Sequence, residues 1–254
     1  MKKSVGISLL CCYNDMTEAR HMLLDSIDSI MGDLPFELDV HMIDSKAKGY
    51  KSAAEAYNKE VALHRDDLKD ILVFCHQDIS FPDSRLLCRI YDDLTFEPSQ
   101  ILGVAGMPSD GSPVSNLKYK SDDGYITRRQ LSEKTAMVTL DECLIAMHKD
   151  VFMSMKFDEN ILKHWHLYAV DICYNARLNH GIESYVLPEM TYHKYSADKG
   201  QATDNTFLCE INNLATKYKN KVDVIRTPCY ILPTSFIPRW RQLLRTMVKN
   251  LIGR

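Results

Sequence analysis

The chain lacks the segments that mark membrane and secreted proteins. Its 254 residues contain no run of eighteen apolar residues, so no ordinary transmembrane helix is expected. Residues 1–15 are basic and then apolar, but the apolar run is short and no small-residue cleavage site follows, so they predict a first strand rather than a signal peptide. The eight cysteines include no C-x-x-C pair and most lie inside apolar runs, which argues against a disulfide framework and indicates a reducing cytoplasm.

Two common phosphate-binding motifs are also missing. No G-x-G-x-x-G follows the first apolar segment, and no G-x-x-x-x-G-K-[ST] occurs, so neither a dinucleotide fingerprint nor a P-loop is present. The net charge is −3, so we expect no nucleic-acid partner. What is present is ordinary globular composition, with 45% hydrophobic and 26% charged residues, in a chain long enough to bury a full core. A nucleotide pocket built on acidic strand ends stays open.

Strand-like and helical patterns alternate along the chain, and this order predicts an α/β fold. The expected strands are 5–12, 36–43, 70–75, 101–107, 137–147 and 184–187, and the expected helices are 17–31, 52–64, 83–94, 150–155, 168–178 and 204–219. A β-α-β order of this kind predicts a single domain with a mostly parallel central sheet flanked by helices. Residues 108–124 are the longest predicted loop, and together with residues 194–205 they are candidate lids over a bound ligand.

Polar residues follow several of the predicted strands, at the edge where open α/β sheets bind ligands. The sharpest example is His76-Gln77-Asp78, directly after the third strand. Residues i and i+2 of an extended segment point the same way, so His76 and Asp78 could face one divalent cation. The alternative is a polar strand end that caps the next helix.

The order of the motifs resembles that of a known family. In sequence they are YND at 13–15, Asp44, AYN at 56–58, ILVFCHQD at 71–78, DECLIAMHKDVF at 141–152, KFDE at 156–159, WHLYAVDICYNARLNHG at 165–181 and YHKYS at 192–196. Over residues 5–196 the chain resembles the family 2 glycosyltransferases of the GT-A fold, in a bacterial branch that has HQD in place of D-x-D. The resemblance implies transfer of a sugar from a nucleoside diphosphate sugar.

The same resemblance implies a metal site. Asp78 matches the second acid of D-x-D, which holds Mn²⁺ or Mg²⁺ under the nucleotide diphosphate. His193 matches a late histidine that completes this site. His76 replaces the first acid, and it could contact either the metal or the ribose.

Nucleotide-binding roles are implied for four further residues. Tyr13 and Asn14 at the first strand end, and Asp44 at the second, match positions that cradle the base and ribose. Asn58 matches the pocket-facing position of the second helix.

The catalytic base is implied less directly, because Ala169 stands where relatives carry an acid. Asp171 is the first candidate, and His166 and Asp141 are the alternatives; Asp171 and His166 could instead be structural. An inverting transfer needs such a group to accept the proton of the acceptor hydroxyl. Trp165 could stack on a sugar ring of donor or acceptor, or could anchor the core.

The C-terminal segment differs in character from the rest. No acid follows Asp223, and the apolar residues of 236–254 repeat at helical spacing among basic ones. We therefore divide the chain into a GT-A-like domain, 1–224, and a basic amphipathic tail, 225–254. Within the domain we expect a nucleotide-binding half, about 1–107, and an acceptor half, about 125–224. The tail suits an anionic membrane surface, packing on the domain, or a partner helix.

The hypothesis from the sequence is a metal-dependent inverting glycosyltransferase. It would act in the cytoplasm, or peripherally at the inner face of the membrane, on a hydroxyl of a surface glycan or lipid-linked acceptor. Two alternatives stay open. One is a non-catalytic subunit that binds a nucleotide or glycan, and the other is a metal-dependent phosphohydrolase using His76, Asp78 and His193.

Overall fold

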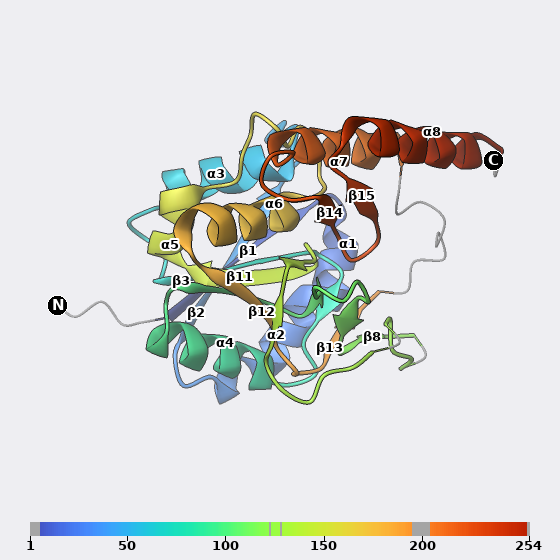
Figure 1. Ribbon diagram of the computed structural model, residues 1–254. Coiled ribbons are helices and arrows are strands. Elements are labelled where there is room, and N and C mark those ends of the chain that lie inside the picture. The colour runs from blue at the N-terminus through green and yellow to red at the C-terminus, as the bar shows by residue number, and fades with distance from the viewer. Residues whose placement is uncertain (1–5, 122, 128, 195–203, 253–254) are drawn as a thin grey trace.

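The computed structural model describes residues 6–121, 123–127, 129–194 and 204–252, and its centre is a seven-stranded sheet (Figure 1). In spatial order its strands are β2 (Glu37–Asp44), β1 (Gly6–Tyr13), β3 (Ile71–Cys75), β11 (Leu144–His148), β5 (Gln100–Gly103), β12 (Glu183–Val186) and β9 (Thr135–Met137). Pairing is parallel for β1 with β2, β1 with β3 and β5 with β12, whereas β11 and β9 run against their neighbours. Five of the seven strands therefore point the same way, as the β-α-β order predicts.

The helices cover both faces of this sheet. They are α1 (Met16–Ala19), η1 (Arg20–Leu24), α2 (Asp25–Ile30), η2 (Met31–Asp33), α3 (Ala53–Leu63), α4 (Arg85–Phe96), α5 (Lys149–Met155), α6 (Tyr168–Asn175), η3 (Ala176–His180), α7 (Asn205–Lys217) and α8 (Phe236–Ile252). In Figure 1, α3, α5 and α6 lie above the sheet and α4 lies below it. Each face has its own apolar core, because strands buried on both sides send alternate side chains to opposite faces.

Strand β3 shows this alternation most clearly. Leu72 and Phe74 pack in one core, while Ile71, Val73 and Cys75 pack in the other, and all five are fully buried. A run of five apolar residues with no polar interruption is what such a central strand requires. The pattern also explains why the chain turns polar directly after Cys75, where the strand leaves the core.

Three small sheets lie beside the central one, and they correct two of the predicted strands. The first contains β10 (Thr139–Leu140), β6 (Ala105–Met107) and β7 (Val114–Ser115); the second β4 (Ile79–Ser80), β13 (Thr191–His193) and β8 (Leu117–Tyr119); the third β14 (Val224–Arg226) and β15 (Ile231–Pro233). The predicted strand 101–107 divides between β5 and β6, and 137–147 divides among β9, β10 and β11. Each predicted strand leaves one sheet for another partway along its length, and a run of apolar residues does not show where this happens. The predicted loop 108–124 likewise contains β7 and β8.

Side-chain caps begin the helices near the ligand edge. Asp15 Oδ1 accepts the Thr17 and Glu18 amides at 3.0 and 3.1 Å, so α1 begins immediately after the first strand end. Ser52 Oγ accepts the Glu55 amide at 3.1 Å and begins α3. These caps satisfy amides that a helix terminus otherwise leaves unpaired, and they fix where the loops of the ligand edge end.

The C-terminal segment is not detached from the domain. Ile225, Leu232 and Leu243 belong to the same buried core as α6 and α7. The boundary that we drew at residue 224 therefore falls inside a packed unit, and helix α8 itself packs on the domain through Leu243. No helix among the described residues is long and apolar enough to cross a bilayer.

Candidate functional site

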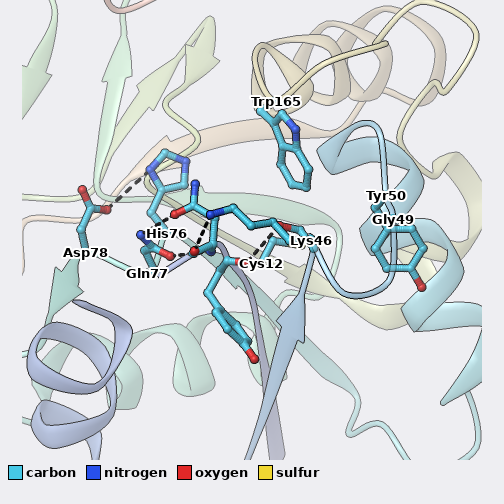
Figure 2. Close-up of a pocket in the computed structure, with 11 residues that line it drawn as sticks. Cys12, Lys46, Gly49, Tyr50, His76, Gln77, Asp78 and Trp165 are labelled. Atoms are coloured by element: carbon cyan, nitrogen blue, oxygen red, sulfur yellow. Dashed lines mark hydrogen bonds and ion pairs between the residues drawn. The ribbon is translucent and has the colours of Figure 1, made fainter. Parts of the chain in front are cut away.

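A cavity of about 590 Å³ lies at the carboxyl ends of β1, β2 and β3 (Figure 2). It is lined by Cys12, Tyr13, Asn14, Ser45, Lys46, Gly49, Tyr50, His76, Gln77, Asp78 and Trp165. The polar strand ends meet there because parallel strands end at one edge of the sheet. Of the predicted site residues, the cavity brings together Tyr13, Asn14, His76, Asp78 and Trp165, and its volume suits a small-molecule ligand.

One corner of the site holds three possible metal ligands. His193 Nε2 lies 3.5 Å from Asp78 Oδ2, and His76 Nδ1 lies 3.9 Å from Asp78 Oδ1. One ligand atom from each residue lies within 4.8 Å of the other two. Two imidazoles and a carboxylate form a donor set that Mn²⁺ accepts, so these residues fit the ion that the sequence predicts.

Strand pairing brings His193 to this corner from far along the chain. β13 pairs with β4 so that His193 stands opposite Ile79, and the Lys194 amide donates to the Asp78 carbonyl at 3.1 Å.

Burial lowers the pKa of His76. The imidazole is therefore neutral near pH 7, which is the form that binds a metal.

Gln77, the middle residue of HQD, joins the metal corner to the end of β1. Its Oε1 accepts the Asn14 amide at 2.8 Å and the Asp15 amide at 3.2 Å. Its Nε2 donates to Asn14 Oδ1 at 3.2 Å and to Glu18 Oε2 at 3.1 Å. Sequence reasoning missed this role, because nothing local shows which segment the middle side chain meets.

Asp44 does not line the cavity but holds the loop that does. Its carboxylate accepts the Tyr13 hydroxyl at 3.3 Å and the Ala47 amide at 2.8 Å. The loop that follows supplies Lys46, whose Nζ donates to the Asn14 carbonyl at 3.0 Å. Lys46 thus places a cation in the wall of the cavity, a feature that the sequence analysis did not single out.

Glu60, on α3, anchors the far end of the same loop. Its buried carboxylate accepts Lys48 Nζ at 2.6 Å and also the hydroxyl of Tyr50. Burial, with the neighbouring Glu60 carboxylate, raises the pKa of Tyr50 to about 12. Tyr50 therefore faces the cavity as a neutral phenol whose position is set from behind.

Asn58 also lies outside the cavity, although its motif position implied nucleotide contact. Its Oδ1 accepts the Phe157 amide at 3.1 Å, and its Nδ2 donates to the Phe157 carbonyl and to Glu159 Oε1, both at 2.8 Å. All its polar atoms are thus used to fasten the segment after α5 to α3. The structure places Asn58 in a packing role.

Asp171, our first candidate for the base, is buried away from the cavity. Its side chain is 3% exposed, and its carboxylate accepts Lys217 Nζ at 2.7 and 2.9 Å and the Tyr218 hydroxyl at 2.8 Å. Burial raises the pKa of Asp171, while Lys217 acts in the opposite direction. We correct this assignment, because a carboxylate enclosed by its partners has no approach to an acceptor hydroxyl.

The two alternative bases are less buried than Asp171 and lie near His76. The Asp141 carboxylate opposes the lowering of the His76 pKa, and His76 acts on the pKa of His166, so both lie within electrostatic range of His76. Asp141 Oδ1 accepts the Cys143 amide at 3.0 Å. His166 Nε2 lies 3.9 Å from Asp204 Oδ1, and burial lowers its pKa.

Trp165 projects toward the cavity and is 38% exposed, so it does not anchor the core (Figure 2). Glu142 sets the turn that carries it, because its Oε1 accepts the amide of Leu167 and its carbonyl accepts the Tyr168 hydroxyl at 3.1 Å. Leu167 has φ 64°, a left-handed conformation that a branched residue adopts only when its surroundings impose it. Burial raises the pKa of Glu142 to about 8. No local pattern singled out Glu142.

The structure describes most of one candidate lid but little of the other. The segment 108–124 carries β7 and β8, and only parts of it are loop. Most of residues 194–205 lie outside the described residues, so this lid stays a prediction.

Comparison with known proteins adds a family and a fold. The model of a family described as "Glycosyltransferase like family" matches residues 8–201. No curated protein matches the sequence significantly. GalNAc-T7 with UDP, GalNAc and Mn²⁺ is 10% identical and has a TM-score of 0.57, over 96% of this chain and 55% of that one.

Two further solved structures share the fold. The mannosyltransferase PcManGT from Pyrobaculum calidifontis, in complex with GDP-Man and Mn²⁺, is 11% identical, with a TM-score of 0.53 over 98% of this chain and 70% of its own. S. aureus TarS with UDP-GlcNAc is 11% identical, with a TM-score of 0.50 over 85% of this chain and 67% of its own. This chain spans little more than half of the GalNAc-T7 chain, and at such identities the likeness concerns the fold.

Proposed function

Because the chain belongs to this glycosyltransferase-like family, we propose that it is a metal-dependent inverting glycosyltransferase. It moves a sugar from a nucleoside diphosphate sugar to a hydroxyl of a surface glycan or lipid-linked acceptor. The observation that carries the proposal is the His76–Asp78–His193 cluster at the edge of the cavity. The Mn²⁺ complexes of GalNAc-T7 and PcManGT, which share the fold, support the choice of cofactor.

Different residues around the cavity bind different parts of the donor. His76, Asp78 and His193 hold Mn²⁺ or Mg²⁺, which when bound neutralises the charge of the diphosphate. Lys46 adds a second cation on the phosphate side. Tyr13 and Asn14 lie where the base and ribose would enter.

Trp165 and Tyr50 supply the aromatic surface of the same cavity. Sugar rings pack their apolar face on such rings, and Trp165 is exposed enough to receive one. We place the transferred sugar against Trp165, which lies above Lys46 in Figure 2.

The base is one of the two candidates near His76. An inverting transfer needs a group that accepts the acceptor proton on the side opposite the diphosphate. Asp141→Asn and His166→Gln separate them: the variant that lowers kcat while the donor Kd is unchanged identifies the base. Unchanged kcat in both variants would contradict a base at either position.

Donor binding is tested by thermal shift with UDP, GDP, dTDP and CDP, each with and without Mn²⁺. A ligand at a hundred times its Kd stabilises by about 2.7 kcal/mol, which moves Tm by several degrees. We expect one diphosphate to shift Tm only with Mn²⁺, and the shift to vanish in Asp78→Ala. Asp66→Ala, at an exposed aspartate, is the matched control. A shift retained in Asp78→Ala would exclude the proposed site.

Two rival functions give different outcomes in the same system. A non-catalytic subunit, favoured by Ala169 and by the burial of Asp171, binds the diphosphate but transfers no sugar to any acceptor. A phosphohydrolase using the same three metal ligands releases phosphate from a simple ester, such as p-nitrophenyl phosphate, without an acceptor.

We also propose that the protein works in the cytoplasm. All eight cysteines are free thiols, and four of them are buried, which suits a reducing compartment. A surface-glycan precursor or lipid-linked acceptor would then be met at the inner face of the membrane.

A further inference from the structure

Helix α8 presents an apolar stripe that the described chain leaves uncovered. Of the twelve large apolar side chains that are exposed in the described residues, six lie on this helix: Phe236, Ile237, Trp240, Leu244, Met247 and Val248. They recur at intervals of three and four residues, so they share one side of the helix. Scattered exposed apolar residues need no explanation, but a concentration of this kind marks an interaction surface.

The side of the helix next to the stripe is fastened to the domain, which fixes the direction in which the stripe faces. Leu243 is buried in the main core, and Arg239 Nη1 donates to Thr216 Oγ1 at 3.1 Å. The Thr246 hydroxyl lies 2.7 Å from that of Tyr230, and Gln242 donates to the Ile231 carbonyl. In Figure 1 the helix runs beside α7 and extends past the other elements. The stripe is therefore held outward rather than free to fold back.

A row of positive charge lies along one edge of the stripe. Arg241, Arg245 and Lys249 are spaced four residues apart and are exposed, and none forms an ion pair within the described ranges. No acid occurs after Asp223, although the whole chain is net negative at −3. The positive charge is thus concentrated on the helix that carries the uncovered apolar surface.

We propose that α8 is a docking helix for an anionic lipid bilayer. An amphipathic helix with one apolar side and a cationic edge lies in the plane of a membrane surface, with the apolar residues below the headgroups and the cations among the anionic phosphates. Trp240, near the start of the helix, has the ring type that favours the interfacial layer. The inference concerns where the protein is held and does not depend on which sugar it transfers.

The same observations disfavour a protein partner. A second copy of this chain, paired through α8, would bring two rows of arginine and lysine together. A heptad pattern does run through Ile237, Trp240, Leu244 and Met247, but the helix is too short for the three to four heptads of a stable coiled coil. Phe236 and Val248 also widen the stripe beyond a coiled-coil seam.

The test is flotation of the full chain with phosphatidylcholine vesicles, with and without phosphatidylglycerol. We expect binding to the anionic vesicles that weakens as salt is raised. Replacing all three cations, in Arg241→Gln, Arg245→Gln and Lys249→Gln together, should reduce binding about a hundredfold, since each cation near such a surface contributes about fivefold.

Apolar variants and a matched control complete the test. Trp240→Ser with Leu244→Ser should abolish flotation, and Phe96→Ser, which removes a still more exposed apolar side chain from α4, should leave it unchanged. Far-ultraviolet circular dichroism and Tm establish that each variant is folded. Absence of flotation for the natural chain, or equal flotation of the α8 variants, would overturn the proposal. So would a dimer in light scattering that Leu244→Ser dissolves. The assay contains no sugar donor, so its failure leaves the transferase proposal untouched.

Discussion

Two aspartates of the predicted site, Asp78 and Asp171, lie in opposite kinds of surroundings. The Asp78 side chain is 24% exposed and faces two imidazoles at 3.5 and 3.9 Å, distances too long for hydrogen bonds. The Asp171 side chain is 3% exposed and is closed by Lys217 at 2.7 Å and by Tyr218 at 2.8 Å. One group has room for a cation between its neighbours, and the other has none.

The difference shows what separates a ligand site from a structural ion pair in this fold. A carboxylate taken out of water must be paired to be tolerated, and Asp171 is paired from two residues at the end of α7. Asp78 is partly exposed, and its two neighbouring imidazoles stand far enough away to leave room for a metal. Four variants test this contrast, from the largest expected effect to the smallest.

Removing the metal-facing carboxylate should have the largest effect on activity. In Asp78→Ala we expect Mn²⁺-dependent sugar transfer to fall by roughly a thousandfold, because the charge of the diphosphate loses its counter-ion. Transfer assays measure this, and urea unfolding should show little change in stability. Activity near that of the natural chain would remove the distinction between the two aspartates.

Breaking the closed pair should instead affect stability. Lys217→Met leaves Asp171 buried without its cation, which costs about 3–5 kcal/mol of the free energy of unfolding. Urea denaturation measures the loss, and Lys219→Met, at an exposed lysine two residues on, is the control. If Lys217→Met lowered donor affinity but not stability, the Asp171 cluster would belong to the site after all.

Glu142 is a third acid whose surroundings can be tested, in this case through the pH dependence of stability. Its pKa is about 8 in the folded chain, against an ordinary value of 4.5, so unfolding releases a proton between these values. The free energy of unfolding should therefore fall as the pH rises from about 4.5 to about 8, by an amount on the order of a few kcal/mol. Glu142→Gln should flatten this slope. Equal slopes in the two proteins would show that Glu142 is not held protonated.

The smallest effect concerns the link between the metal corner and β1. Gln77→Ala removes hydrogen bonds to Asn14, Asp15 and Glu18. We expect the donor Kd to rise about tenfold, equivalent to about 1.4 kcal/mol, with metal binding retained. Calorimetric titration of the diphosphate measures the change. An unaltered Kd would mean that the end of β1 keeps its position without Gln77.

Much of the fold was predictable because its signals are local. The strand before HQD is a run of apolar residues buried on both faces, and Ser52 and Asp15 cap the helices that follow their loops. The predictions were wrong where a strand leaves one sheet for another, as between β5 and β6. Periodicity reports that a segment is buried, but it does not report which neighbour buries it.

In the candidate site, too, the features that depend on local sequence were predictable and those that depend on distant contacts were not. Tyr13, Asn14, His76, Asp78 and Trp165 line the cavity, and the nucleotide, metal and sugar roles that the resemblance implies for them stay predictions. Other roles followed from contacts between distant segments, and these were missed or misassigned. Asn58 fastens the segment after α5, Asp171 pairs with Lys217, and Gln77, Lys46 and Glu142 shape the cavity.

The amino-acid sequence by itself determined the alternation of strands and helices, the ligand edge of the sheet, and the amphipathic character of α8. These features arise from residues close together in the chain, where side-chain spacing and helix caps act directly. Only the tertiary structure decided which acids face the cavity, which partner closes Asp171, and how His193 reaches Asp78 across the β4–β13 pairing. A carboxylate binds a cation or stabilises a core according to its exposure and its neighbours, and both are set by packing between segments that are far apart in sequence.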